Sequence, residues 1–129
     1  ITIDVNEELA DRVKEYYQSS EFSDKIEMKI GKALEIIPTL NKSWDMVFID
    51  ADKSNYLNYY KLCIDQVQKG GYILIDNVLW SGKVLAKNRK KLDKDTQSML
   101  EFNEFVHKDD RVQNVLFPIR DGLMILRKK

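Results

Sequence analysis

The stretch WDMVFIDADK at residues 44–53 joins a nearly continuous apolar run to acidic residues that follow it directly. A second stretch, GGYILIDN at residues 70–77, has the same design, because its apolar run ends in Asp76-Asn77. Short apolar runs of this kind are typical of strands that are buried on both faces of a parallel sheet. We therefore predict two buried strands, Trp44–Ile49 and Tyr72–Ile75, each followed by acidic residues.

Outward from these strands, apolar runs alternate with stretches at helical spacing, which is the pattern of βα units around a largely parallel sheet. Glycine turns and helix caps separate them, for example Asn6 before a helix and Gly31 before another. The alternation predicts an α/β fold, in one domain over residues 1–129. The further strands expected are Ile1–Val5, Ile26–Ile30, Val112–Phe117 and Leu123–Leu126, of which the last two form an antiparallel hairpin around Arg120-Asp121-Gly122.

Composition excludes several classes of protein. The chain has 129 residues, of which 43% are hydrophobic and 33% charged, and this balance is that of a globular protein and not of a disordered one. Its formal net charge is zero, so it is not a domain held to nucleic acid by bulk positive charge. No apolar run approaches the ~20 residues of a membrane span, and we expect no membrane partner. With Cys63 as its single cysteine, a reducing, cytoplasmic location is expected.

Polar side chains at the ends of strands are candidates for a functional site, because ligands of open α/β sheets bind at the carboxyl ends of the strands. Asp4, Asp50 and Asp76-Asn77 each end a predicted strand. Any one of these acids could merely cap a helix or turn. Together, Asp50, Asp76 and Asn77 offer hard oxygen ligands, which suit Mg²⁺, Mn²⁺ or Ca²⁺. The sequence therefore predicts a divalent cation site at this edge of the sheet.

The runs Asp50–Tyr59 and Gly70–Trp80 resemble the two signature blocks of the cation-dependent, caffeoyl-CoA O-methyltransferase-like family, and more distantly catechol O-methyltransferases. The ending Pro118–Leu126 resembles the closing hairpin of that family. The resemblance implies a Rossmann-like S-adenosylmethionine methyltransferase fold with an antiparallel C-terminal hairpin. It further implies transfer of a methyl group to a hydroxyl of a catechol-like or other small aromatic substrate, by a homodimer.

Roles for individual residues follow from the same resemblance. Asp50, Asp76 and Asn77 would hold the divalent cation, and Lys53 matches the base proposed for catechol-type relatives, with Asp50 beside it. Asp4 would bind the ribose hydroxyls of S-adenosylmethionine and Ala33 would lie beside its adenine. Asp50 would approach the methionine part of that cofactor, Tyr59 would contact its carboxylate, and Trp80 would flank the substrate ring.

The sequence also departs from the family pattern. The acidic and glycine-containing loop of the first family strand is absent, as are the leading helices, so we expect a C-terminal portion of a methyltransferase domain. In the family's sheet order, Ile1–Val5 and Trp44–Ile49 would flank the missing strand and each would keep an unpaired edge. Such edges favour association with other polypeptide.

Other interpretations stay open at this point. Methylation of a hydroxyuridine in tRNA is one, favoured by a basic patch at Lys83, Lys87, Arg89, Lys90, Lys91 and Lys94, although such a run is more often a solvated loop. A non-catalytic fragment that binds a metal or a partner chain is another. His107, near the end of a helix, is not expected to be catalytic, and Cys63 and the tyrosines of its helix are expected to pack in the core.

Overall fold

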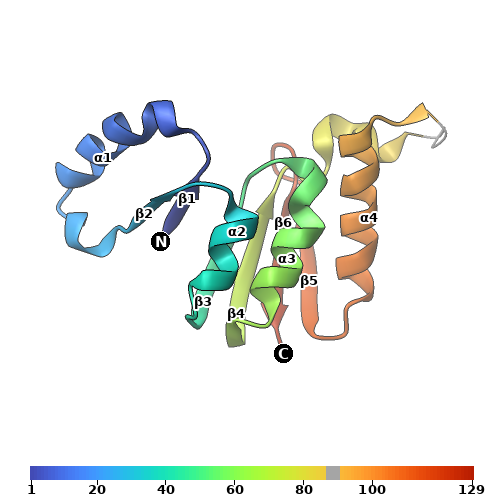
Figure 1. Cartoon of the computed structure of the whole chain (residues 1–129). Helices are drawn as coiled ribbons and strands as arrows, with labels where there is room; N and C mark the ends of the chain where they lie inside the picture. The colour runs from blue at the N-terminus through green and yellow to red at the C-terminus, as the bar shows by residue number, and fades with distance from the viewer. Residues whose placement is uncertain (87–90) are drawn as a thin grey trace. The chain divides into compact units, whose positions relative to one another are not determined.

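The computed structural model describes residues 1–86 and 91–129, and it divides the chain into two compact units, residues 1–40 and 41–129 (Figure 1). The first unit contains β1 (Thr2–Asp4), α1 (Ala10–Gln18), β2 (Met28–Ile30) and α2 (Ala33–Ile36). β1 and β2 pair in parallel, with Asp4 opposite Ile30. The Asn6 side chain accepts a hydrogen bond from the Glu8 amide, which confirms it as the cap of the helical segment that follows.

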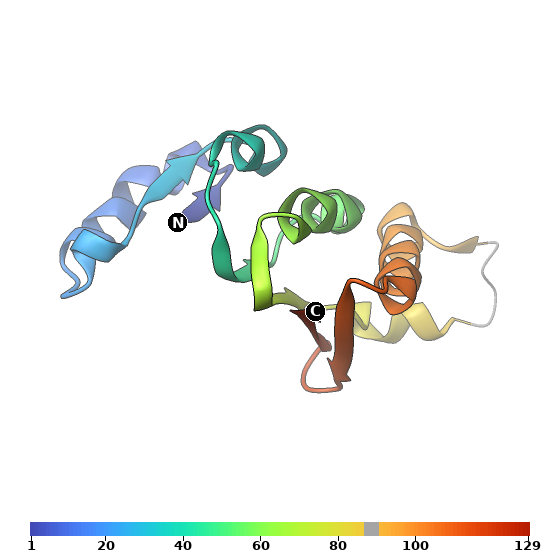
Figure 2. The same cartoon turned by 90° about the horizontal axis from the view of Figure 1, so that it is seen from below.

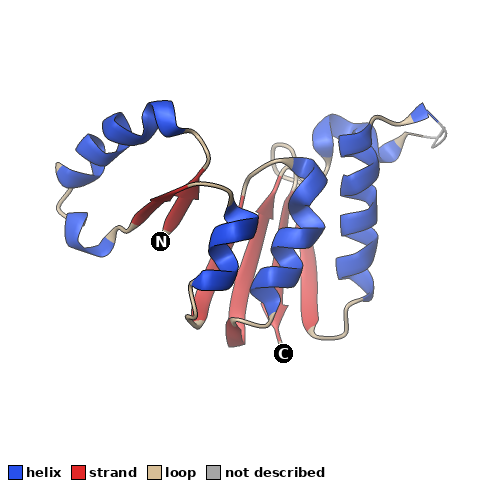
Figure 3. Cartoon of the chain, in the orientation of Figure 1, coloured by secondary structure: helices blue, strands red, loops and turns tan. Residues whose placement is uncertain are grey.

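The second unit is a four-stranded mixed sheet with helices on one face. Its elements are β3 (Trp44–Ile49), α3 (Tyr56–Ile64), β4 (Val67–Asp76), α4 (Lys94–Lys108), β5 (Val112–Phe117) and β6 (Leu123–Lys128). The strand order is β3-β4-β6-β5, with β3 parallel to β4 and the other pairs antiparallel. Figures 2 and 3 show α3 and α4 on the same side of this sheet. The α/β pattern and the C-terminal hairpin are thereby confirmed.

The core of the second unit lies between the sheet and these two helices. Ile73 and Ile75 of β4 are buried beneath the helices. Tyr56 and Tyr60 of α3 pack edge-on against Phe102 of α4, with ring centroids 5.8 and 6.3 Å apart, and all three side chains are fully buried. Aromatic pairs in this geometry stabilise a core by about 0.5–1.5 kcal/mol beyond the burial of their area.

Two expectations about the central strands were wrong. β3 is not buried on both faces, because Met46 and Phe48 alternate outward and are 63% and 59% exposed. β4 starts at Val67 and not at Tyr72, and the helix before it, α3, ends at Ile64. The pair Gly70-Gly71 lies inside this strand, where the pairing with β3 changes register. Gly70 has φ of +82°, a conformation that glycine adopts without strain.

Strand edges in both units match the prediction of unpaired edges. Within the described residues, β1 pairs with β2 alone and β3 pairs with β4 alone. Each of these strands therefore keeps one edge whose backbone groups have no strand partner.

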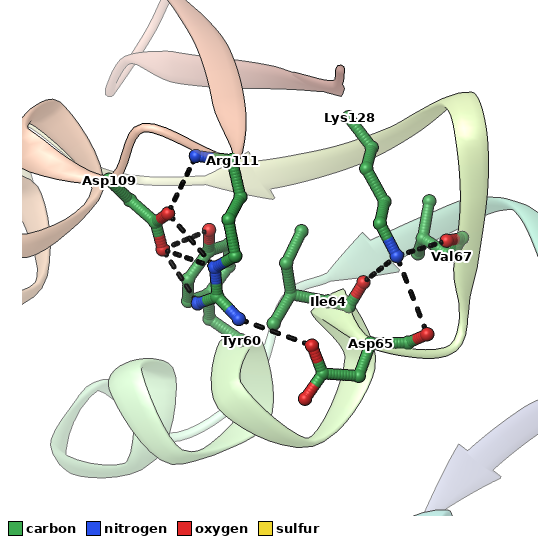
Figure 4. A network of polar contacts seen from close by, with 7 residues as sticks. All are labelled: Tyr60, Ile64, Asp65, Val67, Asp109, Arg111 and Lys128. Carbon is green, nitrogen blue, oxygen red and sulfur yellow. Dashed lines mark hydrogen bonds and ion pairs between the residues drawn. The ribbon is translucent and has the colours of Figure 1, made fainter.

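A polar network fixes the C-terminal end of α3 (Figure 4). Lys128 Nζ donates to the carbonyl oxygens of Ile64 and Val67, at 2.8 and 2.7 Å. Carbonyl groups at a helix end lack partners within the helix, and a cation there is favourable. Beside it, Asp109 accepts hydrogen bonds from the Tyr60 hydroxyl (2.9 Å) and from Arg111 Nη2 (2.7 Å). The network joins α3 to β6 and to the turn after α4.

Acid stability should depend on Asp109, whose side chain is only 7% exposed. Hydrogen bonds from Arg111 lower the pKa of Asp109 to about 2, below the value near 3.9 of an unfolded chain. The carboxylate therefore stabilises the fold above pH ~4, by about 2 kcal/mol, and this contribution is lost as the pH falls towards 2. We expect Asp109→Asn to lower the free energy of unfolding by that amount at pH 7 and by progressively less below pH 4.

Urea denaturation at several pH values measures this difference. Asp110→Asn, at the exposed neighbouring position, is the matched control and should change stability little at any pH. An Asp109→Asn deficit that stayed constant from pH 7 to pH 2.5 would contradict the assignment.

Candidate functional site

The loop after β3 carries the first acidic block. Asp50 follows the last residue of the strand, and its side chain is 52% exposed. Asp52 accepts hydrogen bonds from Asn55 Nδ2 and from the Tyr59 hydroxyl, both at 2.5 Å. These contacts fix the loop against the first turn of α3. Asp52 thus binds groups of its own loop and of the first turn of α3. The Asp50 carboxylate instead contacts Lys53.

The loop after β4 carries the second block. Asn77 adopts a left-handed backbone conformation with φ of +62°, which asparagine tolerates better than most residues. The backbone N–H of Asn77 donates a hydrogen bond to Asp76 Oδ1 at 2.7 Å. The hairpin turn between β5 and β6 supports the loop, because the amides of Val78 and Leu79 donate to the carbonyl oxygens of Gly122 and Asp121. A Cβ atom at Gly122 would lie 2.5 Å from the Leu79 side chain, so only glycine fits here.

The side chain of Lys53 connects the two loops. Its Nζ donates to Asp50 Oδ1 at 3.4 Å, to Asn77 Oδ1 at 3.0 Å, and to the Tyr56 hydroxyl. An ammonium group has three N–H donors, and these acceptors use all three. Lys53 is 8% exposed, so its charge lies in a nearly buried position. Because Asp50 and Asn77 contact one nitrogen from separate loops, the structure brings these two predicted ligands together.

Asp76 contributes to the same corner through its backbone. Its carbonyl oxygen accepts a hydrogen bond from the Tyr56 hydroxyl at 3.1 Å, and its carboxylate binds the Asn77 amide. Burial raises the pKa of Tyr56 above its ordinary value, so the phenol stays protonated and acts as a hydrogen-bond donor. Tyr56 was predicted only as a core residue, and its part in this corner was missed.

The donor chemistry fits a divalent cation. Asp50 and Asn77 turn oxygen atoms towards one cationic group, the Lys53 ammonium, and Asp76 supplies a second carboxylate next to Asn77. Carboxylate and amide oxygens are the ligands that Mg²⁺ and Ca²⁺ prefer. The described residues contain no group of three or more histidines, cysteines or acids that could hold a metal ion. A cation here would accordingly depend on the asparagine oxygen as its third protein ligand.

Trp80 lies on the loop beyond Asn77. Lys53 Nζ and Lys83 Nζ lie 5.6 and 5.4 Å from the centre of its ring, within the range of cation–π attraction. Its indole Nε1 is buried and has no hydrogen-bond partner among the described residues. Trp80 thus lies beside Lys53.

The predicted cofactor residues are distributed over both units. Asp4 ends β1 in the first unit, is exposed, and accepts a hydrogen bond from the Asn6 amide at 2.8 Å through Oδ1. Ala33 is the first residue of α2 in the same unit. Tyr59, in the second unit, donates a hydrogen bond from its hydroxyl to Asp52, and burial raises the pKa of that hydroxyl. In this arrangement Tyr59 has no proton left to donate to a cofactor carboxylate.

The remaining predictions concern residues outside the contacts around Lys53. Cys63 is buried, as predicted, and burial raises the pKa of its thiol to about 11. His107 is exposed in the last turn of α4. Of the basic patch, Lys83 pairs with Asp93 at 3.2 Å, while Lys87, Arg89 and Lys90 lie outside the described residues.

Replacing Lys53 tests whether its ammonium holds the two loops together. Lys53→Met keeps the length of the side chain but leaves Asp50 and Asn77 without their common donor, and should lower the free energy of unfolding by about 1–3 kcal/mol. Lys83→Met is the control, because Lys83 also faces the Trp80 ring but is half exposed, and its loss should cost less than about 0.5 kcal/mol. Equal urea midpoints for the two variants would refute the bridging role.

Comparison with known proteins gives one consistent result. The profile of a family described as O-methyltransferase matches residues 1–129. Caffeoyl-CoA O-methyltransferase 1 from Eucalyptus globulus is 35% identical over 137 residues, which cover 99% of this chain and 56% of that protein. The chain therefore spans little more than half the length of this curated relative.

Solved structures agree on the fold. An SAH-bound methyltransferase from Podospora anserina superposes with a TM-score of 0.87 at 25% identity, over 99% of this chain and 59% of that one. An O-methyltransferase from Bacillus cereus in complex with SAH reaches 0.89 at 24% identity, over 99% and 61% of the two chains, and this likeness concerns the fold alone. The fold is thus the Rossmann-like fold of S-adenosylmethionine-dependent methyltransferases, and the chain belongs to the O-methyltransferase family that includes the caffeoyl-CoA O-methyltransferases.

Proposed function

We propose that this protein is a cation-dependent O-methyltransferase that transfers a methyl group from S-adenosylmethionine to a hydroxyl of a catechol-like or other small aromatic substrate. Membership of the O-methyltransferase family supports the reaction class. The observation that carries the finer assignment is the approach of Asp50 and Asn77, from two separate loops, to the single cationic group of Lys53. A site that gathers oxygen ligands around a positive charge suits a reaction in which an oxygen anion must be held and stabilised.

Asp50, Asp76 and Asn77 are the proposed ligands of the divalent cation, which is Mg²⁺, Mn²⁺ or Ca²⁺. When bound, such a cation stabilises the deprotonated form of a substrate hydroxyl and fixes its position. The left-handed turn at Asn77 and the hairpin beneath it hold the second pair of ligands in place. The half-exposed Asp50 carboxylate leaves room for further ligands from water or substrate.

Lys53 is the proposed base. Its Nζ lies within hydrogen-bond distance of two of the proposed ligands, so a hydroxyl bound there would be close to the amine. To accept the proton, the amine must be uncharged at that moment and must have given up one of its three present contacts. Trp80 would present a flat apolar face to the aromatic ring of the substrate, and the nearby lysines give that face a positive surrounding.

For the cofactor, we propose that Asp4 binds the ribose hydroxyls, that Ala33 lies beside the adenine, and that Asp50 and Tyr59 approach the methionine part. S-adenosylmethionine supplies an electrophilic methyl group on a positively charged sulfur. In the proposed transfer the bond from sulfur to carbon would be exchanged for a bond from carbon to the substrate oxygen, with the electron pair left on sulfur. Tyr59 can take part as a donor only if its hydroxyl leaves Asp52.

The homodimer and the cytoplasmic location stay predictions. None of the helices in the described residues is both long and apolar enough to cross a membrane. The described residues add no observation in favour of tRNA methylation or of a purely binding role. A small aromatic thioester fits better, since a curated relative bears the name caffeoyl-CoA O-methyltransferase.

Loss of a proposed ligand should remove cation-dependent turnover. In the purified protein, we expect Asp76→Ala to lower methyl transfer from radiolabelled S-adenosylmethionine to caffeoyl-CoA or catechol by at least about a hundredfold, because the substrate anion loses its stabilisation. A chelator should do the same to the unmodified protein, and added Mg²⁺ or Mn²⁺ should restore it. Asp110→Ala, in an exposed turn, is the control. Full activity in the presence of chelator would refute the cation assignment.

A further inference from the structure

The Tyr56 hydroxyl contacts both acidic loops of the candidate site and the side chain of Lys53. It donates to the carbonyl oxygen of Asp76 at 3.1 Å, and it accepts from Lys53 Nζ and, at 3.5 Å, from the Ala51 amide. A phenol has one proton to donate and can accept from two donors. Every hydrogen-bonding position of this hydroxyl is therefore in use, with two partners from the segment after β3 and one from the end of β4.

These three partners belong to the two loops whose relative positions bring Asp50 and Asn77 together. Ala51 follows Asp50 on the loop after β3, Asp76 precedes Asn77 on the loop after β4, and Lys53 bridges the two. The hydroxyl is delivered by α3 and does not belong to either loop. Its ring is fully buried and packs edge-on against Phe102, 5.8 Å away, which leaves it little freedom to move. The tightly packed Tyr56 side chain thus contacts both loops.

We propose that Tyr56 is a positioning residue, which sets the distance between the Asp50 loop and the Asp76-Asn77 loop and directs Lys53 towards both. This inference rests on the proposed function in so far as it predicts an effect on cation binding. Tyr56 itself donates its only proton to a backbone oxygen, so it acts on the site through the residues it holds. Residues that orient metal ligands in this way commonly change metal affinity by 10–100-fold when they are replaced.

α3 provides a matched control for the test. Tyr60 is also fully buried and also packs edge-on against Phe102, at 6.3 Å, but its hydroxyl donates to Asp109, far along the helix from the loops. Tyr56→Phe and Tyr60→Phe therefore remove one buried hydroxyl each and keep the ring. A merely structural role predicts similar effects of the two changes, whereas a positioning role predicts that their effects differ at the site.

The first measurement does not involve a cation. Amide hydrogen exchange, followed by NMR at Ala51, Asn77 and Val78, should accelerate by at least about threefold in Tyr56→Phe, because the two loops open more often. The same amides should exchange at the unmodified rate in Tyr60→Phe, apart from any change that all slow amides share. Unchanged exchange at these three amides in Tyr56→Phe, or equal acceleration in both variants, would overturn the proposal.

The second measurement is the affinity of the purified protein for Mn²⁺, by titration calorimetry. We expect Tyr56→Phe to bind Mn²⁺ about tenfold or more weakly than the unmodified protein, and Tyr60→Phe to bind within about twofold of it. Equal affinities of Tyr56→Phe and the unmodified protein would overturn the positioning role towards the cation. If the unmodified protein binds no Mn²⁺, the proposed cation site is refuted, and the exchange rates still decide whether Tyr56 holds the loops.

Discussion

The parallel pairing of β3 with β4 is the constraint on which the candidate site depends. In this register Ile49 lies opposite Ile75, so Asp50, which follows β3, and Asp76, the last residue of β4, lie at the same edge of the sheet. Parallel strands end side by side in this way, whereas antiparallel neighbours send their ends to opposite edges. The antiparallel β6 then contributes its turn and not its end, and that turn supports the Asn77 loop from beneath.

Acidic loops at one edge repel each other unless a positive group lies between them. Here that group is Lys53, which reaches back from the turn that begins α3. Its side chain is nearly buried, and a buried charge is tolerated only when it is paired and fully hydrogen-bonded. The three acceptors of its ammonium meet this condition. The geometry that brings Asp50 and Asn77 together is therefore stabilised, within the chain itself, by a lysine of the first of these loops.

Much of this arrangement could be predicted from the order of residue types. Runs that end in Asp50 and Asp76-Asn77 predict the two strands and their common edge, which the structure confirms, whereas the role of these residues as cation ligands stays a prediction. The predictions that were wrong concern the burial of β3 and the length of β4. The residue types of β3 do not show that Phe48 is exposed, because its exposure depends on what covers the second face of the sheet. Nor could they tell that Gly70-Gly71 lies within β4, because a glycine pair predicts a turn and a register change inside a strand equally well.

The tyrosines of α3 show where sequence periodicity stops being informative. Tyr56, Tyr59 and Tyr60 all lie on the buried side of the helix, and their spacing predicts this correctly. Periodicity reports the position of a ring, however, and says nothing about the partner of its hydroxyl. In the folded chain these hydroxyls donate to three different groups: the Asp76 backbone, the Asp52 carboxylate and the Asp109 carboxylate. Asp52 precedes the helix by a few residues, whereas Asp76 and Asp109 are distant in sequence and come within reach only through the tertiary structure. Three residues that look equivalent in the sequence therefore differ in role, and the difference lies in one oxygen atom of each.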